Sequence, residues 1–208
     1  MQKDPKKNRT DLVANEAILK LKELIKHESI CHLCTNLTQL PLDTRPMSTQ
    51  EVDDEGAIWF MTSKKTQQIT DIQNDNKVQL FYSNTSNYEF LSVFGSASIS
   101  TDRAKIKKLW TPLAKSWFTK GSDDPDITLI KVVPENTYYW DTKSSKMVSL
   151  VKMLVSTVTG KSPDDGVEGK LSVKSKAPVK KKIEPVKKTA GKKSVATGRT
   201  KSSSFVSD

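Results

Sequence analysis

The stretch "DTRPMSTQEVDDEGAIWFMTSKKTQQI", residues 43–69, decides the fold, because it contains two extended runs joined by an acidic turn. The run "AIWFMT" is apolar and aromatic, as half-buried strands are, and Gly56 stands in the turn before it. Arg45-Pro46-Met47 lies on the first run, and Thr62-Ser63-Lys64-Lys65 follows the second. The stretch therefore predicts a β-hairpin that carries a fixed cation on one strand and hydroxyl and ammonium groups on the other.

Further extended runs surround this hairpin. They read "SICHLCTNL", "KVQLFYS", "YEFLSVFGSASIS" and "ITLIKVVPENTYYWD", the last as a pair of segments around Pro134. The runs follow each other closely, without the strand–helix alternation of a parallel sheet. The pattern favours an α+β, mainly β domain that is built on an antiparallel barrel or sheet.

Helices are predicted at the start, in the middle and at the end of this domain. The first spans about residues 13–25 with Thr10 or Asp11 as its N-cap, and a short one lies in "TQQITDIQNDN". A third covers residues 101–117, is capped by Thr101 or Asp102 and is kinked or divided by Pro112. Its apolar face would consist of Ile106, Leu109, Trp110, Leu113 and Trp117. A fourth, "KMVSLVKMLVSTVTG", ends on Gly160.

The charge of the chain is concentrated near its C-terminus. Of the net +10, residues 161–208 carry +8, with 13 Lys or Arg against five Asp or Glu, which leaves only +2 for residues 1–160. We expect a disordered lead over residues 1–10, a folded domain over 11–160 and a disordered Lys-rich tail over 161–208. The tail is either a solvated extension or a nonspecific, salt-sensitive nucleic-acid binder. With no signal-like leader and no long apolar run, the sequence predicts a cytoplasmic protein without a membrane span.

The two ends of the hairpin could hold an anion. Arginine forms paired hydrogen bonds with phosphate, and a helix N-terminus after Lys64, Lys65 and Thr66 offers free N–H groups. The alternative is an edge arginine beside an edge proline, with helix capping by Thr62, Ser63 or Thr66. Either reading is open for each stretch alone, but both stretches belong to one hairpin and can approach the same phosphate.

The sequence contains few residues that could bind a metal or act as a catalytic nucleophile. Cys31 and Cys34 have the spacing of a redox motif. On a strand, however, two residues at this spacing point to opposite faces of the sheet. The chain contains only two histidines, one of them His27 upstream. We therefore expect no metal site and interpret both cysteines as small apolar strand residues.

These motifs, in this order, resemble a known family. Arg45-Pro46-Met47, the Asp/Gly turn, "WFMTSKK", "NDNKVQLFY", "LSVFGSASISTDRAKIKKLW" and "WFTKGSDDPDITLIKVVPENTYYWD" are similar to the general stress protein branch of the pyridoxamine 5'-phosphate oxidase-like, flavin-binding split barrels. The resemblance covers about residues 11–160. It implies an antiparallel split β-barrel with peripheral helices, which forms a homodimer and binds FMN, or FAD, at the subunit interface.

The resemblance also implies which residues contact the cofactor. Arg45, Pro46 and Met47 would lie along the flavin on one strand, and Met61, Thr62 and Ser63 would face it from the next. Lys64, Lys65 and Thr66 would approach the phosphate, and Trp110 and Trp140 are further candidates. Relatives typically carry Ser-Arg-Lys or similar at the helix start, where this chain has Thr66-Gln67-Gln68.

The predicted function follows from this family. We expect a stress-related flavin-dependent oxidoreductase with a small-molecule redox substrate, in which the flavin supplies the chemistry and the protein supplies orientation and electrostatics. The Arg-x-His pair of the true pyridoxamine phosphate oxidase has no equivalent in "YYWDTKSS", so that activity is not expected. The alternatives are a non-catalytic flavin-binding or storage module, and a nucleic-acid-associated protein that acts through its basic tail.

Overall fold

The computed structural model describes residues 8–142 and 166–173. By its contacts the chain divides into two compact units, Met1–Lys176 and Ala177–Asp208, and all described residues belong to the first. The predicted helix over residues 146–160 and most of the predicted tail lie outside the described residues.

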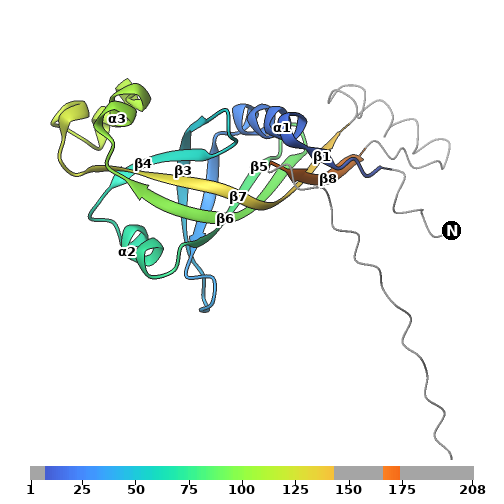
Figure 1. Cartoon of the computed structure of the whole chain (residues 1–208), viewed down its shortest axis with the longest axis horizontal. Coiled ribbons are helices and arrows are strands. Elements are labelled where there is room, and N and C mark those ends of the chain that lie inside the picture. The colour runs from blue at the N-terminus through green and yellow to red at the C-terminus, as the bar shows by residue number, and fades with distance from the viewer. Residues whose placement is uncertain (1–7, 143–165, 174–208) are drawn as a thin grey trace, which may run out of the picture. The chain divides into compact units, whose positions relative to one another are not determined.

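Six antiparallel strands form a closed barrel (Figure 1). Its strand order is β7-β4-β3-β2-β5-β6, and β6 closes the ring by pairing again with β7. The bounds are β2 Ile30–Thr35, β3 Asp43–Val52, β4 Ile58–Ser63, β5 Lys77–Asn84, β6 Glu89–Ser100 and β7 Ile127–Thr142. The predicted antiparallel split barrel with peripheral helices is thereby confirmed.

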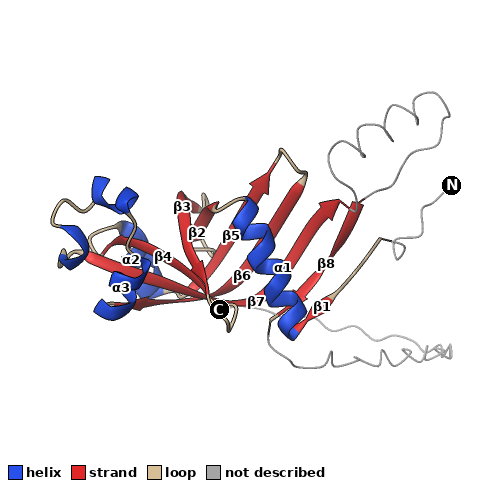
Figure 2. Ribbon diagram, turned by 90° about the horizontal axis from the view of Figure 1, so that it is seen from above, coloured by secondary structure: helices blue, strands red, loops and turns tan. Residues whose placement is uncertain are grey.

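The helices lie outside the strands. Helix α1 (Ala14–His27) runs along the sheet, as Figure 2 shows, whereas α2 (Gln67–Asn74) and α3 (Arg103–Leu109) lie at the other end of the barrel. Two short 3-10 helices, η1 (Pro112–Ser116) and η2 (Gly121–Asp123), connect α3 to β7. The apolar side of α1 buries Ala17, Leu21, Leu24 and Ile25 against the barrel.

Two apolar clusters explain why the hairpin at residues 43–69 takes its position. Alternation along β4 sends Ile58 and Phe60 into the barrel core, while Trp59 and Met61 belong to a second cluster beneath α3. The acidic turn is held by Asp53, whose carboxylate accepts hydrogen bonds from the Ala57 amide and the Trp59 indole, both 2.8 Å long. The predicted hairpin is present, with Thr49 opposite Phe60.

Several expected boundaries differ in the structure. Helix α1 is preceded by Val13 rather than capped by Thr10 or Asp11, because Leu12–Val13 form strand β1. Strand β7 is continuous through Pro134, which lies opposite Gly95 at a register shift where a ladder N–H is not needed. The expected helix over 101–117 is divided at Pro112 as predicted, and Asp102 is its N-cap.

Strand β8 (Gly166–Ser172) is the largest departure, since the sequence placed it in the disordered tail. It pairs with β7 on one side and with β1 on the other, and Leu171 is buried in the barrel cluster. A side chain at Gly169 would place a Cβ 1.8 Å from the Thr10 carbonyl oxygen, so only glycine fits. For residues 166–173 the prediction of disorder is wrong, because a short strand among lysines has too few apolar residues to stand out.

Candidate functional site

A cavity of about 370 Å³ lies between strands β3 and β4, the start of α2 and η1. Its volume is in the range typical of small-molecule sites, roughly 300–1,000 Å³. Strands β3 and β4 form one side, the start of α2 adds a polar edge, and η1 with its flanks forms an apolar side. The lining residues are Pro46, Met47, Ser48, Gln50, Met61, Thr62, Ser63, Thr66, Thr111, Leu113, Ala114, Trp117 and Phe118.

Six of the eleven residues that the family resemblance assigned to the cofactor line this one cavity. They are Pro46, Met47, Met61, Thr62, Ser63 and Thr66. The antiparallel register of β3 with β4 brings the Arg-Pro-Met strand beside the Met-Thr-Ser strand, so that two stretches about fifteen residues apart meet. Their contact with a flavin stays a prediction.

The start of α2 forms the polar edge of the cavity. Thr66 is the residue before the helix, and its hydroxyl donates to the Ser63 carbonyl at 2.9 Å. Gln68, only 1% exposed, donates from Nε2 to the Thr62 hydroxyl at 2.8 Å, and its Oε1 has no hydrogen-bond partner among the described residues. The first N–H groups of a helix have no intrahelical acceptor, so this edge can donate to an anionic or carbonyl group.

A buried carboxylate holds α2 against the barrel. Asp71 accepts hydrogen bonds from the Thr35 hydroxyl at 2.8 Å and from the Gln67 amide at 2.9 Å. Burial by itself raises the pKa of Asp71, but the hydrogen bonds from Gln67, Thr35 and Asn36 and the attraction of Arg45 outweigh it, so the pKa lies below its ordinary value. Asp71 is therefore ionised at neutral pH and fixes the helix whose first turn borders the cavity.

The predicted cations do not line the cavity. Lys65 and Lys64 pair with Asp126, with N–O distances of 2.6 and 3.3 Å, and the hydrogen bond from Lys65 holds the pKa of Asp126 below its ordinary value. Arg45 is half-buried on β3 and exerts its charge on Asp71. The structure thus brings the hydroxyls and methionines together and leaves the lysines at the protein surface.

The two predicted tryptophans lie outside the cavity lining. Trp110 follows α3 and contacts the ring of Phe118, which does line the cavity, at a centroid distance of 6.4 Å. Trp140 lies on β7, paired with Phe90 and Glu168, and its ring contacts Tyr138 at 4.8 Å. Trp110 therefore contacts a lining residue without lining the cavity itself, and none of the strand or ring partners of Trp140 lines the cavity.

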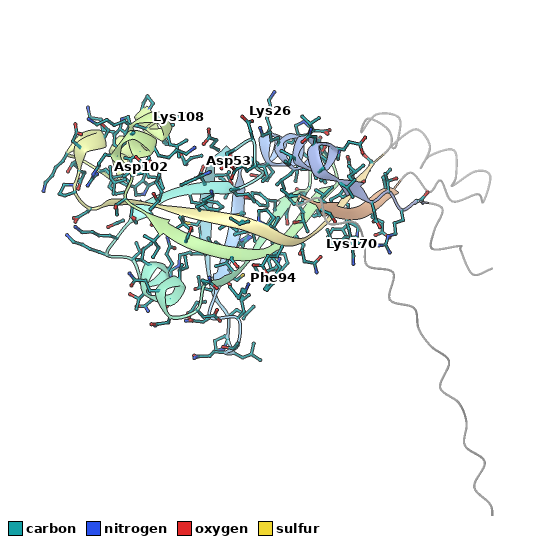
Figure 3. The ribbon with its side chains drawn as sticks, in the orientation of Figure 1. Lys26, Asp53, Phe94, Asp102, Lys108 and Lys170 are labelled. Carbon is teal, nitrogen blue, oxygen red and sulfur yellow. The ribbon has the colours of Figure 1, made fainter. Side chains whose placement is uncertain are left out.

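Sequence reasoning missed the apolar wall. Leu113 and Trp117 were expected on the buried face of one helix, but they are 65% and 69% exposed and line the cavity. Helix α3 spans Arg103–Leu109. Its N-cap is Asp102, labelled in Figure 3, whose carboxylate accepts hydrogen bonds from the amides of Ala104 and Lys105. Pro112 then starts a separate 3-10 turn. Because Trp110 and Thr111 are extended between the two helices, and the second helix has the tighter 3-10 winding, helical spacing across the proline does not predict which side chains are buried.

None of the lining side chains is an acid, a base or a thiol. The described residues also contain no group of three or more His, Cys, Asp or Glu that could hold a metal. Hydroxyl, amide and thioether groups can orient a ligand and exclude water, but they do not supply general acid–base catalysis at neutral pH. The lining side chains can therefore bind and orient a ligand.

Comparison with known proteins places this barrel and cavity in a family. The family profile described as "Pyridoxamine 5'-phosphate oxidase like" matches residues 16–164, most of the chain, and the chain belongs to that family. Among named relatives, it is 26% identical over 110 residues to protein bli-3 of Neurospora crassa, and the match covers 49% of this chain and 53% of that protein. It is also 26% identical over 100 residues to general stress protein 26 of Bacillus subtilis, and that match covers 45% of this chain and 68% of the Bacillus protein. The chain therefore spans about half the length of the Neurospora relative.

Solved structures agree with the fold. A structure from Jannaschia sp. CCS1, provisionally named general stress protein 26, has a TM-score of 0.65 at 24% identity, covering 76% of this chain and 98% of that one. The general stress FMN/FAD binding protein of Xanthomonas citri has a TM-score of 0.54 at 28% identity, and the match covers 62% of this chain and 92% of that one. General stress protein 26 of Bacillus anthracis has a TM-score of 0.53 at 25% identity, and the match covers 59% of this chain and 92% of that one. In the part of the chain that is described, no helix is long and apolar enough to cross a membrane.

Proposed function

We propose that this chain binds a flavin, FMN or FAD, in the cavity between β3, β4, the start of α2 and η1. One observation carries the proposal: six residues expected at a flavin come from two strands and a helix start and line one cavity. The similarity to the Xanthomonas citri structure, described as FMN/FAD binding, supports the same ligand class.

The lining fits such a ligand, because polar and apolar groups occupy different parts of it. Ser63, Thr66 and the unpaired N–H groups at the start of α2 would meet the phosphate and sugar hydroxyls, with Arg45 contributing charge nearby. Met47 and Met61 would pack against the ring system, because thioethers adapt to flat aromatic surfaces. A bound flavin supplies hydride or electron transfer, which side chains of this kind cannot provide.

The side chains would act by position and by exclusion of water. Gln68 fixes the Thr62 hydroxyl at 2.8 Å and lies 3.6 Å from the Met47 sulfur, so it holds two lining residues in one arrangement. Asp71 anchors the same helix through Thr35. A preorganised site loses less entropy when its ligand binds.

We further propose a stress-related oxidoreductase that works as a cytoplasmic homodimer on a small-molecule redox substrate, and not a true pyridoxamine phosphate oxidase. The folded domain would begin near residue 11, and the Lys-rich residues beyond the barrel would form a tail with an affinity for nucleic acid. A flavin-binding or storage module without turnover is the second candidate, favoured by a lining that has no ionisable side chain.

Purified full-length protein separates these possibilities. Visible flavin absorbance that NAD(P)H bleaches supports the oxidoreductase, whereas absorbance without bleaching supports the storage module. A colourless protein that binds DNA, and loses that binding when residues 177–208 are removed while β8 is kept, would indicate the nucleic-acid function instead. Arg45→Ala should weaken flavin binding, and Arg9→Ala, which removes an exposed arginine paired with Asp11, should not. Equal affinity in both variants would contradict the role of Arg45.

A further inference from the structure

A buried glutamine lies behind the polar edge of the cavity. Gln68 is 1% exposed and does not itself line the cavity, but its Nε2 contacts two residues that do. This nitrogen lies 2.8 Å from the Thr62 hydroxyl oxygen and 3.6 Å from the Met47 sulfur. Because burying an amide is costly unless its groups are hydrogen-bonded, these two contacts determine how the side chain is oriented.

The orientation of the Gln68 amide follows from counting donors and acceptors. As observed, its two N–H groups face two acceptors, Thr62 Oγ1 and Met47 Sδ, and only Oε1 has no partner among the described residues. The reversed amide would turn its oxygen toward the sulfur and would leave both N–H groups without an acceptor. Since every buried donor without a partner costs free energy, Gln68 donates to Thr62 and does not accept from it.

Helix α2 keeps this amide within reach of the cavity wall. Ile69, the next residue, packs in the barrel core, and the Asp71 carboxylate accepts a hydrogen bond from the Thr35 hydroxyl at 2.8 Å. The backbone that carries Gln68 is therefore fixed, and Nε2 is a lasting donor to Thr62 rather than one of several rotamers.

A hydroxyl that accepts from a fixed amide still has its own hydrogen to donate. Thr62 is 8% exposed and lines the cavity, and Gln68 is the one hydrogen-bond partner that its hydroxyl has among the described residues. A ligand atom that accepts this hydrogen completes the chain from Gln68 through Thr62, and hydrogen bonds in such a chain strengthen one another. A ligand group that only donates would leave the hydroxyl hydrogen unsatisfied in a largely buried place.

We infer that Gln68 is a positioning residue, which directs the Thr62 hydroxyl to donate to an acceptor oxygen of the bound flavin. The inference rests on the proposed flavin site and adds the chemical direction of one contact within it. A flavin offers such oxygens on its ring carbonyls and, in FMN and FAD, on its phosphate. Gln68 acts through Thr62, so its effect on binding depends on the presence of the Thr62 hydroxyl.

The test titrates full-length protein, freed of flavin, with FMN and with riboflavin, and follows the quenching of flavin fluorescence. Thr62→Val, which has nearly the same shape, removes the hydroxyl and should weaken FMN binding about tenfold. Thr62→Ser should restore most of this loss. Gln68→Met should weaken FMN binding about fivefold in the wild-type background, but less than about twofold in Thr62→Val, because the group through which it acts is gone.

A similar pair outside the cavity provides the matched control. The Gln79 amide donates to the Ser92 hydroxyl at 3.0 Å between β5 and β6, and neither residue lines the cavity. Gln79→Met should therefore leave the affinity for both flavins unchanged. Riboflavin, which lacks the phosphate, identifies the acceptor. Loss of affinity for FMN alone in Thr62→Val assigns it to the phosphate, and loss for both flavins assigns it to the rest of the molecule.

The inference and the proposed function fail in different ways. Equal effects of Gln68→Met in the two backgrounds would overturn the inference, since a loss of packing weakens binding whether or not the hydroxyl is present. Unchanged FMN affinity in Thr62→Val would also overturn it, and this result needs no Gln68 variant that folds. Urea denaturation verifies that each variant is folded before it is titrated. A wild-type chain that binds neither flavin contradicts the proposed function itself.

Discussion

The Thr35→Val substitution should destabilise the protein by removing one donor to a buried carboxylate. The Thr35 hydroxyl is fully buried and donates to Asp71 Oδ2 at 2.8 Å. Valine has nearly the same shape, so the substitution leaves no significant cavity, and the loss of the hydrogen bond dominates. A hydrogen bond to an ionised group contributes about 1.5–3 kcal/mol, and we expect a decrease of that size in the free energy of unfolding at neutral pH.

The effect of Thr35→Val should depend on pH in a defined direction. The pKa of Asp71 in the folded protein lies below the ordinary value of 3.8. A carboxyl group whose pKa is lowered on folding stabilises the protein above its unfolded pKa, and this contribution is lost as the pH falls through the folded pKa. The difference between wild type and Thr35→Val should therefore be full above about pH 5 and should shrink below about pH 4.

Urea denaturation at several pH values, followed by circular dichroism, measures both effects. Thr38→Val is the matched control, because Thr38 is exposed in the loop between β2 and β3. It should leave the free energy of unfolding nearly unchanged. A Thr35→Val variant as stable as wild type at neutral pH, or a difference that grows on acidification, would refute the assignment of Asp71 as an ionised anchor of α2.

Three further predictions test other parts of the fold. Burial raises the pKa of Cys31 to about 12, so its thiol should not react with Ellman's reagent at mildly alkaline pH until the protein is unfolded; fast reaction in the folded state would contradict its burial. Asp53→Ala removes the hydrogen-bond acceptor of the turn before β4 and should lower the free energy of unfolding, measured by urea denaturation, by about 1–3 kcal/mol. The control Asp54→Ala changes a fully exposed neighbour and should leave this free energy nearly unchanged. Gly169→Ala should push β8 away from Thr10, because the added Cβ would collide with the Thr10 carbonyl. The Thr10 amide, which donates to the Glu168 carbonyl, should then lose its protection from hydrogen exchange, and retained protection would argue against the close approach.

The barrel strands could be predicted from the sequence because their apolar runs are long and are bounded by turn residues. The hairpin over residues 43–69 contains both the cation-bearing strand and the strand that pairs with it, so its register brings the two halves of the site together without any information from distant segments. Asp102 could be predicted as a helix cap because aspartate is a preferred N-cap residue, and its carboxylate does accept hydrogen bonds from the first amides of α3.

Features set by distant contacts could not be predicted. Strand β8 is short and lies among lysines, and its place depends on pairing with β7 and β1. The lysines after β4 are predicted to approach a phosphate, and sequence reasoning did not predict that both pair with Asp126, more than sixty residues away. The turn after Pro112 exposes Leu113 and Trp117, which helical spacing had placed in the core.

The central claim is that the cavity between β3, β4, α2 and η1 binds the flavin. The most direct test is the flavin content of purified full-length protein after loading and gel filtration, compared with Ser48→Trp and Ser98→Trp. Ser48 is exposed and lines the cavity, whereas Ser98 is exposed on β6 outside it, so the two variants place the same bulk inside and outside the site. We expect about one flavin per chain in wild type and in Ser98→Trp, and almost none in Ser48→Trp. Full flavin content in Ser48→Trp, or none in wild type, would contradict the account.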